Sequence, residues 1–368
     1  MVASLTSQSV MVVLAPSMAR VARDFHTTVG VVSQARTATA VSAIAASVAL
    51  FPLIARWNLR HLTWLGAAVA VASGVATATA VSMPMFIGAH LLAGVAVALL
   101  LSCSFAGAAL GAGRQAARAL GLVAGANSLG WVFFNPLAGL LTQSVSWRLA
   151  FLLPVASACG AALAALRIPP TAPAPRAAAT TALPALLTIT PVRRWISAEV
   201  LSYCAWTIVL TFVGPVLALA GHLSEGMVGL VLGCGSAGFF LASSQSGRLT
   251  GVARPRLLIA ASSLAIGVLS AVLFGSAGPV WLSVLLFFLV AVAAGVRTPA
   301  ASLLGASLSP EHVRAVMASR TVVTQVGYLF GAAGGGLVLS VGGFTGLGAL
   351  SLVGMVSAGL LHWRHASA

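Results

Sequence analysis

Long apolar runs alternate with short polar gaps along almost the whole chain. Most runs are about 20 residues long, roughly the length that an α-helix needs to cross a bilayer. Turn residues and arginines mark the gaps. This pattern predicts an all-α membrane protein with twelve transmembrane helices in two six-helix bundles. The first six cover residues 2–19, 29–54, 62–82, 84–111, 119–142 and 149–166, and the second six cover 195–220, 226–246, 256–275, 279–307, 314–340 and 343–362.

A proline-rich segment separates the two sets of helices. It reads RIPPTAPAPRAAATTALPALLTITPVRRW, and prolines at this density interrupt a helix. We therefore predict an N-terminal bundle over 1–168, a cytoplasmic linker over 169–194 and a C-terminal bundle over 195–368. Two segments, one in each half, are also similar in sequence: LGAAVAVASG (65–74) and LIAASSLAIG (258–267). Each follows a turn that contains arginines. Such a repeat implies two parallel bundles related by an axis along the membrane normal.

The composition places these helices in lipid. Hydrophobic residues make up 60% of the 368 residues and charged residues only 6%, whereas a soluble domain carries roughly a quarter charged residues. The cysteines form no CxxC pair and have no histidine at metal-binding spacing, so no cofactor or metal is predicted. The chain has too few charged residues to cover a surface that faces water, so it belongs in lipid.

The arginines predict the orientation of the helices. All 19 basic residues are arginines, and when they are sorted by alternate loops, 14 fall on one side and only Arg20, Arg23 and Arg148 on the other. Because cytoplasmic loops carry the excess of positive charge, we expect both termini in the cytoplasm and the protein in the bacterial inner membrane. The arginines are distributed between spans rather than gathered in one patch. The expected partner is therefore the bilayer, not nucleic acid.

The turn after the second predicted helix resembles a signature of the major facilitator superfamily. That family has G-x-L-a-D-R-x-G-R-K there, and FPLIARWNLR (51–60) retains Leu53, Arg56 and Arg60 while Ala55 replaces the acid. The resemblance implies that Arg56 and Arg60 belong to a gating turn. The missing acid implies that another contact gates the protein, or that its gating is weak.

Two further motifs extend the resemblance over essentially the whole chain. HLLAG (90–94) is similar to the family's R-x-x-q-G, with His90 for the arginine, and WVFFNPLAGL keeps Pro136 and Gly139 of the antiporter signature G-x-x-x-G-P-x-x-G-G. SVSWRLAFLLP resembles the family's W-R-x-x-F stretch. The nearest branch is that of the drug:proton antiporters, with eroded motifs.

The resemblance implies a secondary transporter that works by alternating access, with proton-coupled efflux of small amphipathic or weakly anionic compounds as the leading function. An importer or facilitator of a sugar or organic anion is the alternative within transport. A non-transporting membrane sensor with this fold is a third possibility. The cytoplasmic turns contain no nucleophile–histidine–acid set and no phosphate-binding loop, so an enzyme is not predicted.

Polar and aromatic residues inside the spans are the candidates for substrate binding, because ionisable groups within lipid are costly and usually functional. Arg36 could hold an anionic group, pair with Asp24 or extend to the interface, and Arg297 could bind substrate, act in gating, or bond to carbonyls or Glu311. Aromatic and polar residues at helical spacing either line a binding cavity or pack. They are Asn127, Trp131 and Phe134 with neighbouring Asn135, then Tyr203 and Trp206, then Gln325 and Tyr328.

Proton coupling needs a group that titrates within the cavity. Three residues are candidates: Asp24, His90 and Glu199. His90 is the one histidine well inside a predicted span, and histidine changes charge near neutral pH. An interfacial or hydrogen-bonded role is the alternative for each of the three.

Overall fold

The computed structural model describes residues 1–54, 58–109, 114–167, 183–245, 253–276, 278–309 and 313–363. Within these ranges all regular secondary structure is helical. The chain forms two compact units. Unit 1 consists of Met1–Ala178 with Leu223–Gly233, and unit 2 of Ala179–His222 with Cys234–Ala368.

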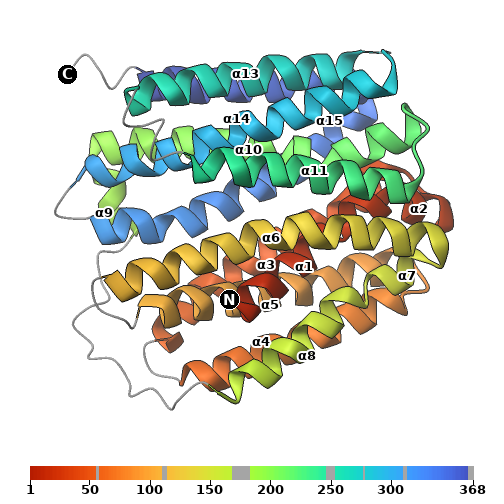
Figure 1. Ribbon diagram of the computed structural model, residues 1–368, viewed down its shortest axis with the longest axis horizontal. Coiled ribbons are helices and arrows are strands. Elements are labelled where there is room, and N and C mark those ends of the chain that lie inside the picture. The colour runs from red at the N-terminus through yellow and green to blue at the C-terminus, as the bar shows by residue number, and fades with distance from the viewer. Residues whose placement is uncertain are drawn as a thin grey trace. The chain divides into compact units, whose positions relative to one another are not determined.

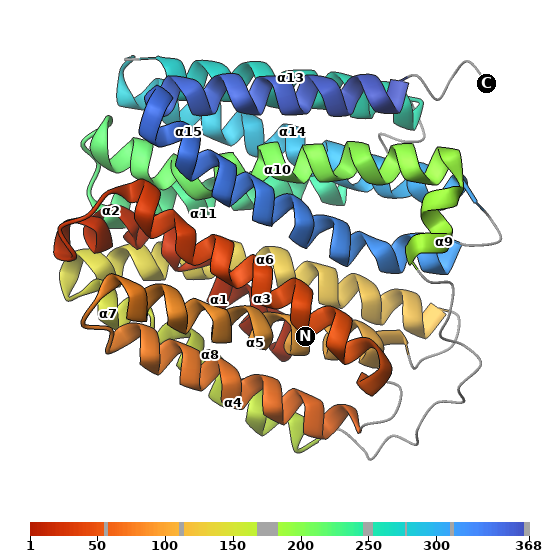
Figure 2. The same ribbon diagram turned by 180° about the vertical axis from the view of Figure 1, so that it is seen from behind.

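Unit 1 is built from the helices of the first predicted set. In chain order they are α1 (Val2–Val12), α2 (Leu14–Asp24), α3 (Val29–Ile54), α4 (Leu59–Ala78), α5 (Met83–Ala109), α6 (Arg114–Ser144), α7 (Trp147–Ala150) and α8 (Leu153–Ala165), and the first part of α11 (Glu225–Ser244) joins them. In both views α4 lies beside α8 (Figures 1 and 2). The first predicted span, 2–19, is interrupted at Val13 and continues to Asp24. The interruption is explained by Pro16, which has no N–H to donate to the carbonyl of Val12.

Unit 2 contains the helices of the second predicted set. They are α9 (Leu183–Thr188), α10 (Thr190–Leu219), the rest of α11, α13 (Pro255–Gly275), α14 (Val280–Ser307) and α15 (Val313–Trp363). Helix α15 packs against both α10 and α13. Helix α9 and the first turn of α10 lie within the segment 169–194 predicted as the linker. Pro191 lies in the first turn of α10, where a helix needs no N–H donor.

Helix α15 is two helices joined at a kink. Gly343 has φ 58° and ψ −158°, a left-handed conformation that glycine adopts without steric cost. The parts on either side, 313–342 and 344–363, correspond to the predicted helices 314–340 and 343–362. When α1–α2 and α7–α8 are each counted as one interrupted span, the described helices match the twelve predicted spans.

Nine helical segments of the described chain are long and apolar enough to cross a membrane, and the last of them, Val322–Trp363, contains the kink. Helices α3 and α6, with 26 and 31 residues, are also long enough. The protein is therefore an all-α integral membrane protein, as predicted.

Glycines allow close contacts between helices in unit 1. A Cβ on Gly94 of α5 would meet the backbone of α3, with the Ala43 nitrogen at 2.8 Å, and a Cβ on Gly139 of α6 would meet Gly229 Cα of α11 at 2.9 Å. The two glycines retained from the family motifs are therefore packing residues, since only a missing side chain lets the backbones approach so closely.

Candidate functional site

A buried cluster of charged side chains lies inside unit 2. Helix α10 supplies Glu199 and helix α14 supplies Arg297, whose Nη2 lies 2.7 Å from Glu199 Oε1. The two side chains are 0% and 4% exposed. Arg297 Nε also donates to Ser263 Oγ of α13 at 3.0 Å. An isolated charge in this position would be strongly destabilising, so each of the two residues needs the other as its counter-ion.

Two more side chains of α15 complete the cluster. His362 Nε2 lies 3.3 Å from Glu199 Oε1, and Arg320 Nη2 lies 4.0 Å from Glu199 Oε2. The same Arg320 nitrogen donates to Tyr203 Oη at 2.9 Å and to the Thr298 carbonyl at 3.3 Å. Side chains of α14 and α15 therefore converge on one carboxylate of α10, and α13 contacts the cluster through Arg297.

Aromatic side chains from two predicted faces meet beside this cluster. The rings of Tyr203 on α10 and Tyr328 on α15 pack edge to face with centroids 6.1 Å apart. Trp206 stacks on Phe239 at 6.4 Å. Gln325 is buried, and its Oε1 has no hydrogen-bond partner among the described residues. Of these predicted residues, Tyr203 contacts Arg320 directly and Tyr328 packs on Tyr203.

The predicted face of α6 in unit 1 contacts α1. Trp131 Nε1 donates to Gln8 Oε1 at 2.7 Å, and Asn127 accepts a hydrogen bond from Ser4. Asn135 is buried and donates to the Trp131 carbonyl at 2.8 Å, while its Oδ1 has no hydrogen-bond partner in the described part of the chain.

Three of these α6 side chains, Asn127, Trp131 and Phe134, are only partly buried. The face is therefore held by α1 and keeps partial exposure.

Arg36 is buried rather than extended to an interface. Its side chain on α3 is 2% exposed, and Nη2 donates to the Met11 carbonyl at 3.2 Å. Asp24, one partner considered for it, instead accepts from Arg148 Nη1 at 2.7 Å and from Trp147 Nε1 at 2.8 Å. The Arg148 guanidinium also lies 4.2 Å from the Trp147 ring centre. Asp24 is therefore part of a structural contact at the end of α2.

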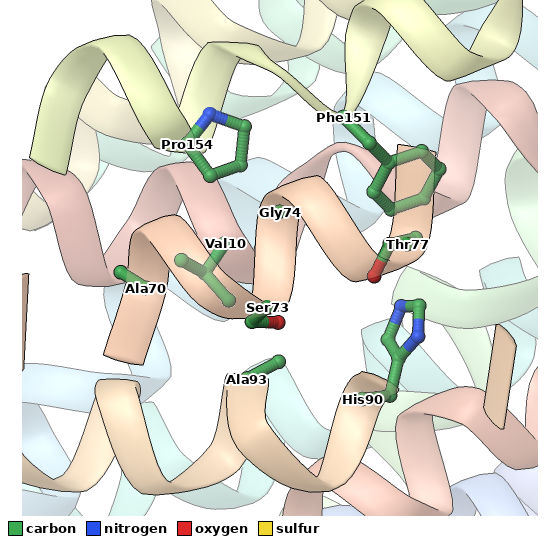
Figure 3. A pocket seen from close by; sticks show the side chains of 9 residues that line it. All are labelled: Val10, Ala70, Ser73, Gly74, Thr77, His90, Ala93, Phe151 and Pro154. Atoms are coloured by element: carbon green, nitrogen blue, oxygen red, sulfur yellow. The ribbon is translucent and has the colours of Figure 1, made fainter. Parts of the chain in front are cut away.

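His90 lines a small pocket among α1, α4, α5 and α8 (Figure 3). Its Nδ1 lies 2.8 Å from the Phe86 carbonyl, and its ring packs against Phe86 and Phe151 at 4.7 and 5.8 Å between centroids. The pocket has space for about one water molecule. It is too small for an organic substrate.

Of the predicted gating turn, Arg56 lies outside the described residues. Arg60 lies in the first turn of α4, where its backbone N–H donates to Asn58 Oδ1 at 2.9 Å. Asn58, which replaces a glycine of the family pattern, is therefore the N-cap of α4.

Three members of the unit 2 cluster were missed from the sequence. Arg320 was counted only with the cytoplasmic arginines, although it lies within α15 and within the predicted helix 314–340; His362 and Ser263 were not among the candidates. One signal was available for Arg297. A buried arginine needs a carboxylate, and the chain has only four, namely Asp24, Glu199, Glu225 and Glu311.

The model of one protein family matches this chain over residues 1–196, and its description is Major Facilitator Superfamily. The chain belongs to the Major Facilitator Superfamily. It is therefore a membrane transporter rather than an enzyme. No sequence among curated proteins matches it.

Solved structures similar to this transporter confirm the fold. A crystal structure of a D-xylose–proton symporter has a TM-score of 0.79 and 14% identity, covering 99% of this chain and 96% of that one. The nucleoside transporter NupG has a TM-score of 0.76 and 12% identity, covering 99% and 98%. A bacterial homologue of the human lysosomal transporter Spinster, inward-facing and occupied, has a TM-score of 0.71 and 14% identity, covering 100% and 93%. At these identities the likeness concerns the fold alone.

Proposed function

We propose that this transporter exports small amphipathic or weakly anionic compounds by alternating access, in exchange for protons, as in the drug:proton antiporter branch. The observation that carries the proposal is the buried cluster around Glu199, because charged groups inside membrane spans are retained chiefly where they serve transport. Two guanidinium groups share one carboxylate there. This excess of positive charge favours neutral or anionic substrates over cations.

In this proposal each unit has its own set of partly buried aromatic and amide side chains for contacts with substrate. Tyr203, Trp206 and Tyr328 supply apolar area, as does Trp131, whose one N–H already donates to Gln8. Asn127, which accepts from Ser4, supplies an amide group at a fixed place. Apolar walls with a few oriented polar groups are typical of small-molecule sites.

Glu199 is the coupling residue in this proposal. It is wholly buried and contacts both His362 and Arg297, so a proton on either the carboxylate or the imidazole would change the charge seen by the arginines. Asp24 and His90 are less suited. Asp24 is occupied by Arg148 and Trp147, and His90 packs between aromatic rings.

Sugar uptake with protons is the second candidate. It is favoured by the buried amides of Asn135 and Gln325, each with an oxygen that has no hydrogen-bond partner among the described residues, because such oxygens accept well from hydroxyl groups. The D-xylose–proton symporter is also among the similar structures.

Vesicles of opposite orientation distinguish the two candidates. On energisation, everted vesicles should accumulate exported compounds from a panel of amphipathic acids, whereas a symporter should load a sugar into right-side-out vesicles. Arg297→Ala and Arg36→Ala should each reduce transport at unchanged protein level, and Arg193→Ala, which alters an exposed residue of α10, should not. Unchanged transport in both variants would contradict the site assignment.

The proposal includes a bacterial inner-membrane monomer with both termini and the connection between the bundles in the cytoplasm. It is supported by the distribution of the arginines along the sequence.

A further inference from the structure

Arg320 differs from the other members of the cluster in how it is held. Glu199 Oε1 is occupied by Arg297 and His362, whereas Arg320 stands 4.0 Å from Oε2, beyond hydrogen-bonding distance. Glu199 Oε2 has no hydrogen-bond partner among the described residues. Arg320 therefore lies near the carboxylate but forms no hydrogen bond with it.

The geometry of Arg320 leaves part of its guanidinium available. Within the described part of the chain its hydrogen bonds all leave from Nη2, to Tyr203 Oη and the Thr298 carbonyl. The N–H groups of Nε and Nη1 remain for a further acceptor. The Arg320 side chain is 19% exposed, against 4% for Arg297, so an incoming group can reach it.

The charge balance also points to an anion. Arg297 and Arg320 carry two positive charges and Glu199 carries one negative charge, so with His362 neutral the cluster has one unmatched positive charge. A partly buried charge of this kind is stabilised by a counter-ion. The tyrosine rings beside it provide an apolar surface for the rest of the ligand.

We propose that Arg320, positioned by Tyr203, binds the carboxylate of a small aromatic or amphipathic solute, with Tyr203 and Tyr328 against its apolar part. Arginine N–H groups form charge-assisted hydrogen bonds with carboxylates, which are about twice as strong as neutral ones. The inference deepens the proposed function, since it names the group on the substrate and the residue that recognises it.

The test measures binding without transport. The full chain, purified in a nonionic detergent, is titrated with sodium benzoate, with benzamide as the uncharged analogue and sodium chloride as the ionic-strength control, and the midpoint of thermal unfolding is recorded. Benzoate alone should raise the midpoint in the unaltered protein. Arg320→Gln should raise the benzoate Kd at least about tenfold, while Arg193→Gln, in an exposed position of the same unit, should leave it unchanged.

A second variant keeps the test valid if Arg320→Gln does not fold. Arg320→Lys retains the charge beside Glu199, but its single amine cannot hold Tyr203 and a ligand in the same geometry, so the Kd for benzoate should rise about threefold to tenfold. Unchanged binding in either folded variant overturns the inference, as does an equal effect of benzamide. If phosphatidylglycerol raises the unfolding midpoint and benzoate does not, the ligand is a lipid headgroup, and this result also overturns the inference.

Binding and transport fail separately in these experiments. If benzoate binds through Arg320 and no vesicle accumulates an acid, the proposed export is wrong and the binding site stands. If vesicles export acids and Arg320→Gln binds benzoate normally, the site is wrong and the export stands.

Discussion

Replacing Glu199 with glutamine tests whether water is excluded from the cluster, as the burial of its side chains indicates. The side chain keeps its size but loses its charge, which leaves Arg297 and Arg320 without their shared counter-ion. Two unit charges about 4 Å apart interact by about 4 kcal/mol at an effective dielectric constant of about 20. Removing one partner of a buried pair costs about 3–5 kcal/mol. We therefore expect Glu199→Gln to lower the free energy of unfolding by about 3–5 kcal/mol.

The ion pair between Asp24 and Arg148 provides a matched control. Its N–O distance is also 2.7 Å, but its side chains are 43% and 40% exposed. Exposed pairs contribute about 0.2–1 kcal/mol, so Asp24→Asn should cost far less than Glu199→Gln. Burial is then the main difference between the two substitutions.

Unfolding is measured by titrating the purified protein from a nonionic into a denaturing detergent and following helicity by circular dichroism. The double variant Glu199→Gln with Arg297→Met should recover part of the loss, because it removes one uncompensated charge. Equal losses for Glu199→Gln and Asp24→Asn would refute the reasoning. They would mean that water reaches the cluster and screens it.

Three further predictions concern packing, hydrogen bonding and orientation. Gly139→Ala should cost about 1–3 kcal/mol of unfolding free energy, because its Cβ meets the backbone of α11, whereas Gly125→Ala on the same helix has nothing within 4 Å and should cost nothing; similar losses would contradict the packing. Trp131→Phe should cost about 1 kcal/mol in the same titration through its lost 2.7 Å indole hydrogen bond, and an unchanged midpoint would count against that bond. In a cysteine-free background, Val145→Cys should react with an impermeant maleimide in intact cells, and Arg167→Cys only after permeabilisation; the reverse pattern would invert the proposed orientation.

The helices could be predicted from the sequence because their signal is local. Length and hydropathy alone gave the spans, and the end of the span before Gly343 was placed within a few residues. Helix α10 begins at Thr190, before the predicted span 195–220, because proline, which interrupts a helix in its interior, is well suited to its first turn.

The cluster could be predicted only in part because its members meet through tertiary packing. Glu199 and Arg297 were both candidates, but nothing local to either residue says that α10 and α14 bring them within 2.7 Å. Sorting by alternate loops grouped Arg320 with the cytoplasmic arginines, although the predicted helix 314–340 contains it. Its hydrogen bonds to Tyr203 and to a backbone carbonyl depend on how α10 and α14 pack against α15, which no local pattern gives.

The membership of Leu223–Gly233 in unit 1 constrains the order in which this protein can be assembled during synthesis. Domains usually fold as units, with the N-terminal one first. Here Arg23 pairs with Glu225, and Gly139 packs on Gly229, yet both partners emerge from the ribosome only after the whole of α10, which belongs to unit 2. We therefore expect the contacts of α6 with α11 to form only after α11 has been inserted, and a chain that stops before residue 223 to lack them.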